Sequence, residues 1–125
     1  MATVLTNTGK AEMIDALNGG THTPPQHVAW GTGAGTAGET DTTLFTEASE
    51  SRVSGTKSVV TTTVTNDTYQ VVGTLTADGT KTITNAGLFD ASTSGNLYVK
   101  GDFTGIALNA SDSIQFTFKI VQDQA

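Results

Sequence analysis

Hydrophobic and polar residues alternate most strictly near the end of the chain. Ile114, Phe116, Phe118 and Ile120 are separated from one another by single polar residues. Successive side chains of a strand point to opposite faces, so this pattern predicts a strand with one face in the core and one in water. It is the clearest strand in the sequence.

Shorter patterns of the same kind predict further strands upstream. The expected strands are residues 27–31, 58–65, 68–77, 81–90 and 96–103. Turn-forming residues separate the later ones: Asn66-Asp67, Asp78-Gly79, Ser94-Gly95 and Asn109–Asp112. Asp78-Gly79 is the strongest hairpin signal, because both residues tolerate positive φ. Short strands at spacings near ten residues predict an all-β fold, an antiparallel β-sandwich of jelly-roll or meander type, as a single domain over residues 1–125.

One short helix is expected near the N-terminus, over about residues 9–18. Ala11, Ile14 and Leu17 recur at helical spacing. Asn18-Gly19-Gly20 would end the helix, because glycine readily takes the left-handed conformation found at helix ends. About ten residues do not form a stable helix alone, so we expect the apolar side to dock on the sheet.

The first half of the chain carries a glycine-rich loop and most of the uneven charge. Residues 31–43 read GTGAGTAGETDTT, and we expect a loop that packs against nothing and is mobile in the free protein. Residues 1–50 hold one basic and six acidic side chains, whereas the rest of the chain is nearly neutral. Simple solvation would explain these carboxylates. The alternative is that the N-terminal segment and residues 31–52 face a basic partner surface, with contacts from Glu39, Asp41, Glu47 and Glu50.

Composition narrows the possible partners. The chain has a net charge of −6, so it lacks the basic patch that nucleic acid or an anionic membrane would attract. About one fifth of the residues are threonine, a β-branched residue that suits half-exposed strands. There is no cysteine and no apolar stretch long enough for a signal or a membrane span. We therefore expect assembly in a reducing cytoplasm and no export.

Residues that could carry catalysis do not form a recognised site. GTGAGTAG (31–38) lacks the helix that must follow a nucleotide-binding loop, and it contains no lysine. His22 and His27 flank two prolines and do not form a zinc motif. Trp30 is more readily explained by core packing than by a binding hot spot. We expect no enzymatic activity, no cofactor and no metal site.

Three blocks of sequence together resemble a family of small structural proteins of tailed bacteriophages. The first is HVAWGTG (27–33) after the predicted helix. The second is Thr42, Leu44, Glu47 and Arg52 at T-x-L-x-x-E-x-x-x-x-R spacing. The third is TITNAGLFDASTSGNLYVKGDF (82–103) followed by LNASDSIQFTFKI (108–120). One departure is Asn109-Ala110-Ser111, where the family pattern has glycine before the aspartate.

The resemblance implies a non-enzymatic protein of the virion that is assembled in the host cytoplasm. The first expectation is a capsid decoration (cement) protein that binds the major capsid protein or another virion protein and stabilises the shell by binding only the assembled lattice. We expect it to form a homo-oligomer, with a trimer favoured. The alternative is a tail or tail-fibre module involved in host attachment.

Overall fold

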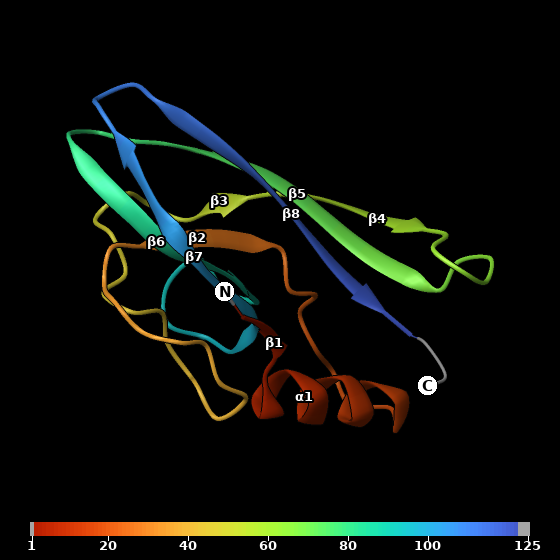
Figure 1. The fold of residues 1–125 in the computed structure, drawn as a ribbon. Helices are drawn as coiled ribbons and strands as arrows, with labels where there is room; N and C mark the ends of the chain where they lie inside the picture. Colours follow the sequence, from red (N-terminus) through yellow and green to blue (C-terminus); the bar gives the residue numbers. More distant parts are fainter. Residues whose placement is uncertain (1, 123–125) are drawn as a thin grey trace.

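The computed structural model describes residues 2–122 and consists of two packed antiparallel sheets and one short N-terminal helix (Figure 1). The predicted β-sandwich is confirmed. In chain order the elements are β1 (Thr3–Leu5), α1 (Asn7–Leu17), β2 (His27–Gly31), β3 (Val53–Ser54), β4 (Thr56–Val60), β5 (Thr68–Thr76), β6 (Lys81–Phe89), β7 (Leu97–Leu108) and β8 (Ser113–Val121).

One sheet has five strands in the order β1-β7-β6-β2-β3, and the other has three in the order β4-β5-β8. The core between them is made of large apolar side chains from both sheets. On β8, Phe118 and Ile120 are buried while Ile114 and Phe116 are half-buried, so the predicted apolar face is confirmed. Other core residues include Val28, Trp30, Val71, Leu75, Ile83 and Leu88. Trp30 is 1% exposed, which confirms its role in core packing.

Strands β5 to β8 form one long two-stranded ribbon that bends at a corner. β5 pairs with β8 in one sheet, and β6 pairs with β7 in the other. At the corner the two segments of the ribbon remain hydrogen-bonded. Ala77 N–H donates to Asp112 O, and Ser111 N–H donates to Ala77 O, both at 2.8 Å. Both long strands bend together at the upper left of Figure 1. The ribbon therefore carries the chain from one sheet to the other, and the two bonds of Ala77 connect its strands at the corner between the two ladders.

The predicted hairpin at Asp78-Gly79 is therefore wrong. Residues 77–80 carry the chain from one sheet to the other, and Asn109–Asp112 form the matching turn on the second strand. A tight turn at Asp-Gly fits either role, and the long-range pairing of Ala77 with residues 111 and 112 decides between them. The ribbon's own hairpin turn is at Ser94-Gly95, as predicted, where both residues have positive φ (52° and 73°).

The strand predicted over residues 58–65 is shorter and begins earlier, as β4. The carboxylate of Asp67 accepts hydrogen bonds from the backbone N–H groups of Thr62, Thr63 and Val64, at 2.8–2.9 Å. These bonds give the backbone an alternative to the sheet ladder, so residues 61–67 form a compact loop.

The helix spans residues 7–17, with Thr6 as its N-cap, but its docking face is not the predicted one. Ile14 is 65% exposed and Leu17 is 84% exposed. The helix approaches the sheet through Gly9, where a β-carbon would lie 2.9 Å from the backbone of Tyr98. The absence of a side chain at this position lets the two backbones meet. The apolar stripe that predicted the helix faces outward instead.

Candidate functional site

The acidic segment, residues 31–52, lies across the face of the five-stranded sheet that points away from the three-stranded sheet. Leu44 is 5% exposed and packs in a second apolar cluster with Ala29, Phe89 and Leu97. Ala37 is also buried. The burial of Ala37 contradicts the prediction that the loop of residues 31–43 packs against nothing. Its few apolar residues bury themselves against the outer face of the sheet.

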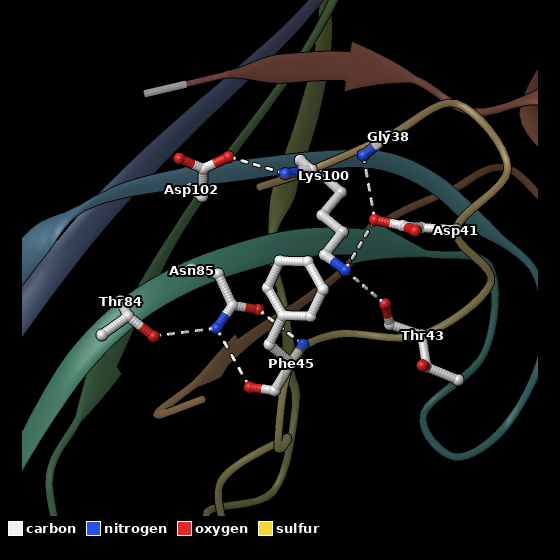
Figure 2. A network of polar contacts seen from close by, with 9 residues as sticks. Gly38, Asp41, Thr43, Phe45, Thr84, Asn85, Lys100 and Asp102 are labelled. Atoms are coloured by element: carbon white, nitrogen blue, oxygen red, sulfur yellow. Dashed lines mark hydrogen bonds and ion pairs between the residues drawn. The ribbon is translucent and has the colours of Figure 1, made fainter. Parts of the chain in front are cut away.

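A buried lysine on β7 holds the middle of the segment (Figure 2). Lys100 is 1% exposed, and its Nζ atom lies 2.9 Å from Oδ2 of Asp41 and 2.8 Å from the carbonyl oxygen of Thr43. The same Nζ lies 3.3 Å from the centroid of the Phe45 ring, a cation–π contact. Hydrogen bonds from the backbone of Gly38 and from Lys100 lower the pKa of Asp41, which therefore stays ionised beside the lysine.

Asn85, on β6, fixes the chain next to this lysine (Figure 2). Its side chain is fully buried. Its Oδ1 accepts from Phe45 N–H and its Nδ2 donates to Phe45 O, each at 3.0 Å. One amide side chain thus satisfies both backbone groups of Phe45, as a neighbouring strand would. On β7, Asp102 accepts a 2.7 Å hydrogen bond from Ala37 N–H and fixes the glycine-rich part of the loop.

Glu50 anchors the end of the segment at the corner of the ribbon. It accepts hydrogen bonds from Trp30 Nε1 and Asp78 N–H, each at 3.0 Å, and forms an ion pair with Lys81. The Glu50 side chain is 8% exposed. Burial alone would raise the pKa of Glu50, but the bonds from Lys81, Asp78 and Trp30 outweigh it and lower the pKa to about 2.

Glu47 is held by Arg52. The guanidinium forms two parallel hydrogen bonds of 2.9 Å to the Glu47 carboxylate, the strongest geometry for this pair. Arg52 also donates to the carbonyls of Ala91 and Ser94, at the hairpin turn of the ribbon, and stacks 3.6 Å over the Phe89 ring. Two of the four positions in the second block of the resemblance, Glu47 and Arg52, are thus one structural pair.

Glu39 is the most exposed of the four predicted carboxylates. Its side chain is 60% exposed and lies 3.3 Å from Lys10 of α1, whose side chain is 45% exposed. Asp41, Glu47 and Glu50 instead have specific partners within the chain. Contact of these four residues with another protein stays a prediction, and the structure gives three of them an internal role.

Comparison with known proteins identifies the family. The family model described as podophage GP4 fiber I protein gp80 matches residues 4–122. The chain belongs to this family. The comparisons with curated proteins and with solved structures found no match.

Membership of the podophage fiber I family makes the chain a structural protein of tailed-phage virions, as the resemblance implied. It favours the tail-fibre alternative over the capsid decoration reading, because the family is described as a fiber protein. Within residues 2–122, no three His, Cys, Asp or Glu side chains are grouped as a metal ion would require. The described part of the chain also has no helix long and apolar enough to cross a membrane.

Sequence reasoning found the acidic residues of the site but missed Lys100, which pairs with Asp41, and Asn85, which holds the backbone of Phe45. Lys100 and Asn85 lie in strands buried on both faces, where a charged or amide side chain requires a partner. A lysine directly after the apolar run Leu97-Tyr98-Val99 was the available signal. The sequence did not indicate which segment, 59 residues away, would supply the carboxylate.

Proposed function

We propose that this protein is a non-enzymatic subunit of a podophage tail fibre that acts by binding other virion proteins and contributes to host attachment. The single observation that carries this proposal is the match of the fiber I family to nearly the whole chain, residues 4–122. The matched residues include the helix and nearly all of both sheets.

The acidic segment supports a binding role. Its backbone is fixed by Lys100, Asn85 and Glu50, so its outward side chains keep a defined arrangement before any partner arrives. A surface that is already ordered loses less conformational entropy on binding. The outward positions of the segment are mostly hydroxyl-bearing or acidic: Thr32, Thr36, Glu39, Thr40, Thr42, Thr43, Thr46, Glu47 and Ser49.

The location in the particle is the decisive test. Purified virions would be analysed by quantitative mass spectrometry for copy number, and by gold-labelled antibody for position. A fibre subunit is expected in a small number of copies, with label on the tail appendages. Hundreds of copies per particle with label over the shell would overturn the fibre assignment and restore the decoration reading.

A second experiment tests the acidic surface. Phage carrying Glu39→Gln are expected to incorporate fewer copies of the protein per particle, because an exposed carboxylate that faces a basic partner is lost. Thr65→Lys is the matched control, since it also changes the net charge by +1 but lies in the exposed loop between β4 and β5. Equal incorporation of both variants and wild type would show that Glu39 is not at the interface.

A further inference from the structure

Among residues 2–122, the three-stranded sheet ends at β8, a nine-residue strand with no neighbouring strand on its outer side. The sheet order is β4-β5-β8, so every second backbone N–H and C=O of β8 points away from β5 toward no other strand of residues 2–122. Long exposed edges of this kind are templates for pairing with another chain. Natural proteins shorten or cover such edges, whereas this one keeps nine residues in regular pairing register.

The side of the sandwich beside this edge is also incompletely covered. β1 pairs with β7 only at residues 99–101, so the second half of β7 lacks a strand on the same side of the molecule. Phe103 of β7 and Phe116 of β8 lie there with ring centroids 6.2 Å apart, and both are only half-buried. Ile106 is 41% exposed. The sandwich is therefore open between β7 and β8, with apolar side chains at the opening.

We propose that the β8 edge pairs with the β8 edge of a second copy of this chain, antiparallel and around a twofold axis. The two three-stranded sheets would become one six-stranded sheet. Because the interface uses the same surface on both copies, both edges are satisfied at once. Phe116 and Ile114 of each copy, half-exposed in the single chain, would be covered by the partner's inner face.

Charge fixes the register of this pair. Lys119 is the one charged residue of β8. Pairing centred on Lys119 would place two ammonium groups directly opposite, which is destabilising. Pairing centred on Thr117, the middle residue, places each Lys119 opposite Gln115 of the other copy. This register also uses all nine residues of each strand, so it makes the largest number of backbone hydrogen bonds.

The second free edge of the sheet fits this role less well. β4 has five residues and carries Lys57. β4 and β8 are both antiparallel to β5, so they run in the same direction. In a ring of copies whose strands lie along the ring axis, β8 of one copy would therefore pair with β4 of the next copy in a parallel arrangement. Parallel pairing is slightly weaker per residue, and this one would be shorter and would bring Lys57 and Lys119 to one seam.

Cysteine cross-linking tests the pair directly, because the chain contains no cysteine. In the proposed register the two copies of Thr117 are opposite one another, at a Cα separation within the range that a disulfide spans. Thr117→Cys is therefore expected to give a disulfide-linked dimer on mild oxidation. Ser113→Cys is the matched control: it lies on the same face of the same strand, but the two copies would be about 27 Å apart.

Circular dichroism of both variants and the solution mass of the wild type complete the test. A folded T117C protein that cross-links, an S113C protein that does not, and a wild-type dimer would support the pair. A wild-type monomer at all concentrations would overturn the proposal. So would equal cross-linking of both variants, or a wild-type trimer without a T117C cross-link. If T117C failed to fold, the solution mass of the wild type would still test the proposal, because a monomer or a trimer would contradict it.

Discussion

The Nζ atom of Lys100 lies 2.9 Å from Oδ2 of Asp41, and this ion pair joins the centre of β7 to the middle of the acidic segment. The lysine is 1% exposed, while the aspartate side chain is 25% exposed. The lysine is therefore the partner that depends on the pair. It has left water almost completely, and its charge is balanced by one carboxylate, one carbonyl and one aromatic ring.

Removal of the Asp41 carboxylate should destabilise the fold strongly. Breaking a buried pair leaves an uncompensated charge and typically costs 3–5 kcal/mol. We expect Asp41→Ala to lower the free energy of unfolding by about 3 kcal/mol, since Thr43 and Phe45 still contact the ammonium. Urea denaturation measures this change in the free energy of unfolding. Glu39→Ala, which removes an exposed carboxylate from the same segment, should change stability by less than about 0.5 kcal/mol. Equal effects of the two substitutions would contradict the structural role of Asp41.

Acid should weaken the attachment of the segment through Glu50. Its pKa is about 2 in the folded protein against an ordinary value of 4.5. A lowered carboxyl pKa stabilises the folded state fully above about pH 4.5, and this stabilisation is lost as the pH falls from there toward 2. The thermal midpoint measured between pH 7 and pH 2.5 should fall less steeply for Glu50→Gln than for wild type. Parallel curves would show that another group controls the acid response.

His22 should show the opposite pH dependence. Its Nε2 lies 2.7 Å from Oδ2 of Asp15, and its Nδ1 lies 2.5 Å from Oε2 of Glu12. The hydrogen bond with Asp15 is the largest cause that raises the pKa of His22 above 6.5. The charged form is therefore favoured, and its contribution to stability is complete below pH 6.5 and lost as the pH rises through the raised pKa. An NMR titration should give a lower pKa in Asp15→Asn than in wild type, and no change in the control Asp112→Asn.

The two inner aromatics of β8 should differ in their contribution to stability. Phe118 is 8% exposed, whereas Phe116 is half-buried at the open side of the sandwich. Phe118→Ala should cost about 3–5 kcal/mol as a core truncation, and Phe116→Ala should cost clearly less in the monomer. Equilibrium unfolding of both variants at low protein concentration makes the comparison. A larger loss for Phe116→Ala would mean that this side chain is covered under those conditions.

The strands could be predicted from the sequence because strand periodicity is a local property. The alternation of Ile114 to Ile120 placed β8, and Ser94-Gly95 placed the hairpin turn, with no knowledge of distant residues. The neighbour with which each strand pairs is determined by residues far away in the sequence. Whether the chain after Asp78 returns alongside β5 or crosses to the other sheet depends on the bonds of Ala77 to residues 111 and 112.

The docking face of the helix and the order of the acidic segment were missed for related reasons. Gly9 contributes no hydrophobicity, so a pattern analysis assigns it no role, yet its lack of a side chain allows the closest approach. The segment's order comes mainly from polar side chains on β6 and β7 rather than from its own apolar residues. The composition of a loop therefore does not predict its mobility when the residues that hold the loop lie in distant strands.

The continuous ribbon of β5 to β8 has a consequence for the order in which the chain folds. Once the turn at Ser94-Gly95 closes, most further pairs of residues form close to a pair already made, along β6 and β7, past the corner at Ala77 and on to Thr68 and Val121. Only short segments have to close along this path, at the two bulges of β6 and β7 and at the corner, so the entropic cost is low. β1, α1 and β2 lie far from the ribbon in the sequence, so they can dock only after β6 and β7 have formed. We expect residues 68–121 to form the folding nucleus, and the N-terminal half to join it last.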